Sequence, residues 1–214
     1  MAGRLVITSV SRHRSDGSVE SLEFKEGVNV LIGEGNTGKT KWFETIDYLL
    51  GDEVSAEERQ DPENVLFNLF DSASALMSLN GEEVSVERKW REPGSLSKVY
   101  VNGVAQNVKD YCRFLMERLG IPLLHYPQGN PYGSRTWPEL TWRTLFRHIY
   151  RRETLWSDLA DLQPEVDQHA SLMLFLGAAD RVFSQDYGDL VSKNKRLWEL
   201  QSRRDQFMNM LDQV

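Results

Sequence analysis

The residues with the clearest chemical potential form one short run, Gly33-Glu34-Gly35-Asn36-Thr37-Gly38-Lys39-Thr40. The run has the spacing Gly-x-x-x-x-Gly-Lys-Thr, in which backbone N–H groups surround phosphate oxygens. Its glycines supply torsions and clearance that a Cβ would obstruct. We expect Lys39 to reach the β- and γ-phosphates of ATP or GTP as the catalytic charge, and the Thr40 hydroxyl to ligate Mg²⁺. The run therefore predicts a Walker A P-loop that holds a nucleotide by its phosphates.

The segments on either side of this run have the patterns that such a loop needs. Val28–Ile32 is a short, strongly apolar segment, which predicts a strand buried on both faces. After the loop, apolar residues recur at helical spacing from Trp42 to Leu50, and Gly51 is a natural stop. The predicted local structure is strand, glycine loop and helix.

The rest of the first 140 residues alternates as strands do. Arg4–Val10 and Val19–Phe24 predict a hairpin around the turn at Ser15-Asp16-Gly17. An antiparallel meander is predicted from three further segments, which are Ala75–Leu79, Val84–Arg88 and Val99–Val101. A helix is expected over Val108–Leu119, followed by a long irregular loop over Leu123–Trp137.

The last third of the chain is predicted to be helical. Thr141 is a candidate cap for a helix over Trp142–Tyr150, and a second helix is expected over Asp167–Phe175. From Leu190 onward, alternating steps of three and four predict the first heptads of a coiled coil. A single amphipathic surface helix is the alternative.

Composition limits the classes of protein to consider. The 214 residues are 40% hydrophobic and 27% charged, which is ordinary for a globular protein, and the net charge of −7 excludes a surface that is basic throughout. Cys112 is the single cysteine, so no disulfide forms within the chain and a reducing cytoplasm is the expected compartment. No apolar run is long enough for a membrane span, so we expect no membrane contact.

The opening of the chain resembles the N-terminal half of SMC-like ABC-type ATPases, the group that contains RecF, RecN, SbcC and the SMC proteins. The resemblance rests on the hairpin, on Phe24–Gly33 leading into the P-loop, and on the helix Lys41–Leu50. It implies an α/β P-loop NTPase fold, an ABC-type head lobe with a mixed or antiparallel sheet. The expected division is a P-loop lobe over 1–140, a helical lobe over 141–188 and the start of a coiled-coil arm over 189–214.

The resemblance also implies a function and partners. In that family ATP joins two heads into a homodimer, and hydrolysis changes their grip on DNA in repair or anti-phage defence. Hydrolysis needs a C-terminal ATPase half, on the same or a separate chain, with a signature sequence and a Walker B Asp-Glu pair, and neither motif occurs here. A nucleotide-gated scaffold or regulator with little turnover is the alternative, and a small-molecule kinase is a more distant one.

The sequence departs from the family at two places. Gly35-Asn36 stands where the family commonly has Asn-Gly, so the loop backbone is expected to differ there. The Q-loop residue, which contacts Mg²⁺ or its water in the family, could be Glu153, Gln128 or Gln163.

The segment Arg143–Gln168 also looks like SMC-like ATPases of bacterial defence and repair operons.

Arginines provide the remaining candidates for phosphate contact. Arg143, Arg147 and Arg151 recur at steps of four, with Arg152 beside them, so they could bind a DNA backbone or form a solvated helix face. Arg12 and Arg14 lie where related ATPases contact nucleotide phosphates, and ordinary surface arginines are the alternative. The four histidines show no metal-ligand spacing.

Overall fold

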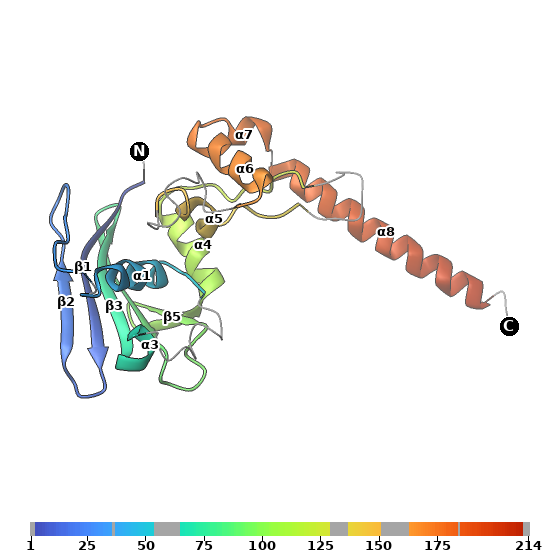
Figure 1. Ribbon diagram of the computed structural model, residues 1–214. Helices are drawn as coiled ribbons and strands as arrows, with labels where there is room; N and C mark the ends of the chain where they lie inside the picture. The colour runs from blue at the N-terminus through green and yellow to red at the C-terminus, as the bar shows by residue number, and fades with distance from the viewer. Residues whose placement is uncertain are drawn as a thin grey trace. The chain divides into compact units, whose positions relative to one another are not determined.

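The structure is a computed structural model that describes residues 3–35, 37–53, 65–128, 137–150, 163–183 and 185–211. The chain divides into two compact units, Met1–Ile121 and Pro122–Val214, and each is described by itself. The first unit contains the sheet and the predicted P-loop. The second unit is helical (Figure 1).

The strands of the first unit form one antiparallel sheet of six strands among the described residues, in the order β2-β1-β3-β4-β5-β6. The strands are β1 (Leu5–Arg14), β2 (Val19–Glu23), β3 (Phe70–Leu79), β4 (Glu82–Lys89), β5 (Lys98–Val101) and β6 (Val104–Asn107). From β3 to β6 each strand pairs with the next along the chain, so the predicted meander is confirmed. β1 pairs with both β2 and β3, which confirms the hairpin.

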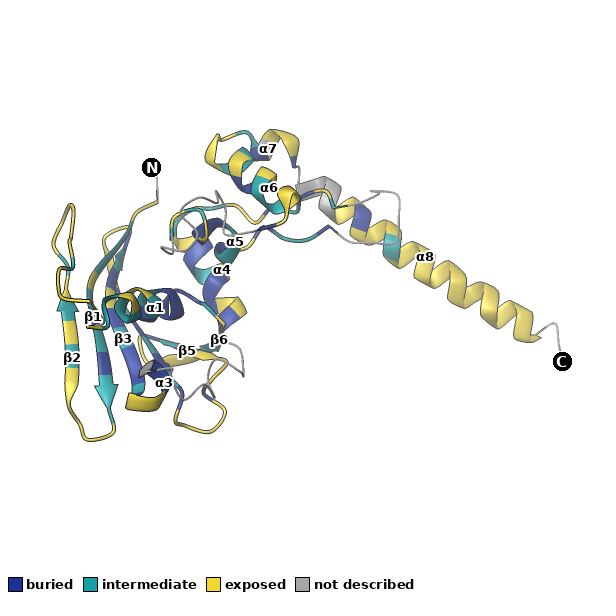
Figure 2. Ribbon diagram, viewed as in Figure 1, coloured by how far each residue is buried: buried dark blue, intermediate teal, exposed yellow. Residues whose placement is uncertain are grey.

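One face of this sheet is buried by helices α1 (Lys39–Leu49), α3 (Val65–Leu69) and α4 (Val108–Arg118). α1 and α3 contact β3, and α4 contacts β5 and β6 (Figure 1). Directly opposite residues of four strands form a buried row beneath these helices, namely Val10, Ala75, Val86 and Val101. Burial on this face and partial exposure on alternate residues explain why period-two patterns in the sequence located these strands (Figure 2).

The end of α1 packs into an aromatic cluster. The rings of Tyr48, Phe67 and Trp90 meet edge to face, with centroids 5.2 to 5.9 Å apart. Such contacts stabilise a core beyond the burial of area alone. The cluster ties α1 to α3 and to the end of β4, so the helix after the P-loop is fixed at its C-terminal end.

The second unit contains α5 (Trp142–Phe146), α6 (Glu165–Phe175), α7 (Ala179–Val182) and α8 (Gln185–Leu211). α6 contacts α5 and α7. Thr141 caps α5 through a hydrogen bond to the Thr144 N–H, as predicted. Tyr126 Oη donates to Asp167 on α6 at 2.7 Å, and these contacts build a small core. α8 is largely exposed along its described length (Figure 2).

Two features differ from the sequence prediction. α5 ends at Phe146 and continues only as turns to Ile149, so the helix predicted over Trp142–Tyr150 is shorter. Val28–Ile32 forms no strand in the structure, and Val28, Val30 and Ile32 are 93%, 73% and 87% exposed. The apolar pattern is typical of a strand that is covered on both faces. No strand among the described residues pairs with this segment.

The buried hydroxyl of Tyr111 on α4 generates a stability prediction. The residue is fully buried, and its Oη has no hydrogen-bond partner among the described residues. Burial raises the pKa of this phenol. Replacing Tyr111 by Phe keeps the ring and removes an orphaned polar group, so we expect the unfolding free energy at pH 7 to stay equal or rise by about 1 kcal/mol.

The same variant should change the response to alkali. A pKa raised in the folded state gives stability that is complete below the unfolded pKa, roughly 10, and is lost as pH rises above it. Urea unfolding at pH 7 and pH 10.5 should therefore show Tyr111→Phe losing less stability than the parent. Tyr100→Phe, at a partly exposed ring, is the control. A larger alkaline loss in Tyr111→Phe would contradict the assignment.

Candidate nucleotide-binding site

The predicted P-loop ends at the N-terminus of α1. Gly38 is the N-cap residue of α1, with φ of 80° in the left-handed region, and no side chain caps the helix. Left-handed backbone favours glycine, so the second glycine of the motif is required here by geometry. An uncapped N-terminus leaves its first N–H groups directed outward, where they can bind an anion.

Charges at this end of the helix favour an anion as well. The first turn of α1, all of whose residues are described, contains no acidic residue, and it carries Lys39 and Lys41. Lys41 pairs with Glu44 at 2.8 Å, so its charge is partly satisfied. Thr40 is exposed, which leaves its hydroxyl accessible to a ligand. The helix dipole adds to the positive potential at the loop.

Within the loop, Lys39 is folded across the run that precedes it. Its Nζ donates to the Gly33 carbonyl at 2.9 Å and to the Glu34 carbonyl, and it lies 3.3 Å from Thr37 Oγ1. Thr37 Oγ1 donates to the Glu34 carbonyl at 2.8 Å. A Cβ on Gly33 would lie 3.1 Å from Thr37 Oγ1, so the close fit disfavours a larger residue. The loop therefore holds an ammonium group among its own carbonyls, within reach of anything bound at the helix end.

Of the two residues at the middle of the loop, Gly35 and Asn36, the structure describes Gly35. Gly35 has open space around its missing Cβ, and its φ lies outside the positive range. Asn36 is outside the described residues. The residues present fit a phosphate group on three counts, which are the uncapped helix end, the local positive charge and the glycine clearance. They fit Mg²⁺ only through Thr40, and Mg²⁺ usually keeps several waters and takes further ligands from substrate phosphates.

The chain entering the loop is anchored by one side chain. Asn29 Oδ1 accepts from the Lys25 N–H at 2.9 Å, while its Nδ2 donates to the Lys25 carbonyl at 2.8 Å and to the Gly27 carbonyl at 3.2 Å. Beside it lies an apolar cavity of about 150 Å³, lined by Phe24, Val30, Trp42 and their neighbours. The turn is thus fixed, whereas the apolar side chains that follow it are left uncovered.

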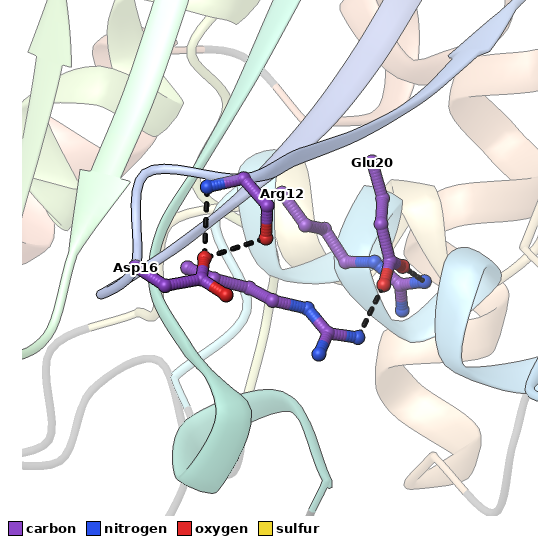
Figure 3. Close-up of polar contacts among 5 residues, drawn as sticks. Arg12, Asp16 and Glu20 are labelled. Atoms are coloured by element: carbon purple, nitrogen blue, oxygen red, sulfur yellow. Dashed lines mark hydrogen bonds and ion pairs between the residues drawn. The ribbon is translucent and has the colours of Figure 1, made fainter.

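Arg12 and Arg14 are engaged with the protein itself. Both guanidinium groups pair with Glu20, Arg12 at 2.7 Å and Arg14 at 2.5 Å (Figure 3). Arg12 is only 6% exposed, and its guanidinium lies 3.7 Å from the centre of the Trp42 ring. Burial lowers its pKa, and Glu20 opposes that effect. Arg12 on β1 therefore packs against α1 in this structure. Its stacking on Trp42 was not predicted from the sequence.

The other sequence candidates lie in the second unit. Gln163 is buried and donates from Nε2 to the Thr144 carbonyl at 2.9 Å, Gln128 is partly exposed, and Glu153 is outside the described residues. The Q-loop assignment stays open. Of the arginine stripe, Arg143 and Arg147 are described, at α5 and just after it, and Arg151 and Arg152 are not. Within the described ranges no group of three or more His, Cys, Asp or Glu could hold a metal ion.

Comparison with known proteins gives a loose structural similarity and no family match. No protein-family model matches the chain, and no curated protein matches it. Among solved structures, one described as "Structural biochemistry of ATP-driven dimerization and DNA stimulated activation of SMC ATPases" is similar over 54% of this chain and 80% of its own, at 17% identity and a TM-score of 0.41. This similarity is too loose for one protein to define the other, so the function proposed for this chain rests on its own residues.

What the chain shows directly is a mixed α/β architecture built on a six-stranded antiparallel sheet among its described residues. In that part of the chain, no helix has both the length and the apolar character needed to cross a membrane.

Two of the three glycines of the loop, Gly35 and Gly38, give a matched pair of predictions. At Gly38 an alanine would have to adopt a φ near 80°, and we expect a loss of about 1 kcal/mol in the unfolding free energy. At Gly35 the backbone is not left-handed and the space is open, so Gly35→Ala should stay within about 0.5 kcal/mol of the parent. Urea unfolding of both variants measures the difference. Equal losses at the two positions would contradict the assigned loop geometry.

Proposed function

We propose that this chain is the ATP-binding N-terminal portion of an SMC-like ATPase head. One observation carries the proposal: a Gly-x-x-x-x-Gly-Lys-Thr run that ends on an uncapped helix N-terminus, with Lys39 folded over its carbonyls. The bound nucleotide would be ATP with Mg²⁺. Its phosphates would take the N–H groups of residues 33–40 and the charge of Lys39, and Thr40 would ligate the metal.

The residues before the loop support the proposal that a second ATPase half completes the head. Val28, Val30 and Ile32 are exposed although each is a strong strand former, and their neighbours line an apolar cavity beside α1. An apolar segment of this kind is stable as a strand when neighbouring strands pair with its edges and other elements cover both of its faces. A C-terminal half, on the same or a separate chain, would supply those strands.

The same half would supply the chemistry that is missing here. Phosphoryl transfer to water requires a residue that orients or deprotonates the nucleophile, and a group that stabilises the leaving charge. Lys39 provides the second, and no apolar strand ending in Asp-Glu follows it in the sequence. We therefore expect the chain to bind ATP without efficient turnover, and ATP-bound heads to pair as a homodimer.

α8 supports a coiled-coil arm. Its heptad positions Leu190, Leu197, Leu200, Phe207 and Leu211 are all about half exposed within the described part of the helix. An apolar stripe that repeats every three and four residues is buried most simply by a second helix. We assign this stripe to the start of the arm.

DNA is the proposed ligand of the assembled protein, in repair or anti-phage defence. Arg143 and Arg147 lie one helical turn apart and supply positive charge for a phosphate backbone. The second candidate function is a nucleotide-gated scaffold or regulator, which the missing Asp-Glu pair favours, because such a protein needs ATP binding and no general base.

The test is ATP binding and turnover by the 214-residue chain and by the natural reading frame that contains it. Lys39→Ala should weaken Mg²⁺-dependent binding at least tenfold, because it removes the cation at the phosphates. Lys41→Ala, which removes the neighbouring lysine of the same helix turn, is the matched control and should bind within about threefold of the parent.

Comparing the 214-residue chain with the longer protein separates the candidate functions. Turnover that appears only with the C-terminal half supports the ATPase head, and binding without turnover by either protein supports the scaffold. Absence of ATP binding in the folded parent chain contradicts both. Rapid turnover by the 214 residues alone would instead identify a self-contained NTPase.

A further inference from the structure

Two arginines from different strands lie in one row beneath α1. Arg12 on β1 and Arg88 on β4 are each directly opposite Ala73 on β3, so the three residues form a line across the sheet. All three are buried, and Arg88 is 1% exposed. Ala73 separates the two guanidinium groups with the smallest side chain that a strand can present, which leaves room for long side chains to rise on either side.

The first arginine contacts the beginning of α1. Its guanidinium stacks on Trp42, the fourth residue of the helix, and pairs with Glu20 on β2. A cation over an indole face is attracted by the ring quadrupole, and more strongly where water is excluded. Arg12 thereby links β1 and β2 to the helix turn that follows the P-loop.

The second arginine contacts the end of the same helix. Arg88 stacks on the Tyr48 ring at 3.5 Å, and its Nη1 donates to the Tyr48 carbonyl at 2.8 Å and to the Asp52 carbonyl at 2.5 Å. Its Nη2 donates to the Leu96 carbonyl at 3.2 Å. Carbonyl groups at a helix C-terminus carry partial negative charge, and the last turn of α1, fully described, contains no basic residue of its own.

Burial of these charges is costly, so their contacts indicate a specific task. Burial lowers the pKa of Arg88 as it does that of Arg12. Replacing a whole buried ion pair or triad by apolar side chains is often neutral or stabilising, whereas in some proteins a buried charged group fixes one arrangement among several. Here the arrangement they fix is the position of α1, whose first turn is the phosphate site.

We propose that Arg12 and Arg88 are positioning residues that hold α1 at its two ends and thereby set the position of the P-loop. The inference rests on the proposed ATP binding and adds to it residues that contact no phosphate. In catalysis, a displacement of roughly 1 Å caused by a distant mutation can cost roughly a hundredfold in rate. By the same dependence on position, loosening the distal end of α1 should weaken phosphate binding.

The principal variant is Arg88→Met, which keeps an unbranched apolar stem and removes the contacts to the Tyr48, Asp52 and Leu96 carbonyls. Binding of a fluorescent ATP analogue with Mg²⁺ should weaken at least tenfold, at a temperature where circular dichroism shows the variant folded. Hydrogen exchange at the amides of residues 40–43 should accelerate at the same time. Arg118→Met is the matched control, because Arg118 pairs with Glu82 of the same sheet at an exposed site.

The conservative variants distinguish positioning from general stabilisation. Arg88→Lys keeps the charge without the planar fork, and should bind ATP with an affinity between those of the parent and Arg88→Met. If Arg88→Met does not fold, Arg88→Lys and Arg12→Lys take its place, with weakened binding at unchanged melting temperature as the supporting result. Parent-like ATP affinity and parent-like exchange at residues 40–43 in folded Arg88 variants would overturn the inference. Failure of the parent to bind ATP would overturn the proposed function instead.

Discussion

The packing of α1 on the sheet is the interaction on which the candidate site depends. Its last turn buries Tyr48 and Leu49 and meets Phe67 and Trp90 edge to face, while its first turn stays open to solvent. A helix that is apolar at one end and uncapped at the other orients its N–H groups outward by default. The candidate phosphate site would thus be a consequence of how this helix is buried, and the residues of the loop would complete it.

The sequence predicts those parts of the fold whose signals are local. The β1–β2 hairpin, the strands β3 to β5 and the helices α1, α4 and α8 all follow from periodicity, because each has one buried face or one apolar stripe. β6 was not predicted because its residues are largely exposed and show no apolar alternation, and α3 was not predicted because it spans only five residues. Val28–Ile32 has a strong apolar pattern and yet forms no strand. A segment that is apolar on both faces becomes a strand only when neighbouring strands pair with it.

The residues of the candidate site also divide into those with a local sequence signal and those without one. Gly33, Lys39 and Thr40 are predicted as phosphate and metal ligands from spacing alone, because a phosphate cradle is made by consecutive residues. The roles of Arg12 and Arg88 could not be predicted, since they arise from the register that places both opposite Ala73. In sequence, an arginine in a strand resembles a surface residue or a phosphate ligand. Only strand pairing reveals that both lie on the helix-covered face.

On the proposed function, this difference between local and non-local residues would also explain how ATP binding and hydrolysis can be separated. Phosphate binding needs the N–H groups of one loop and one lysine, which eight consecutive residues can provide. Hydrolysis needs a further group placed within hydrogen-bond reach of an attacking water, and that group must come from a different element. Val28–Ile32, directly before the loop, is where strands from another segment would bring it close. Pairing with that other segment would then complete the sheet and the catalytic site in one step. ATP turnover would therefore measure whether the two segments have assembled.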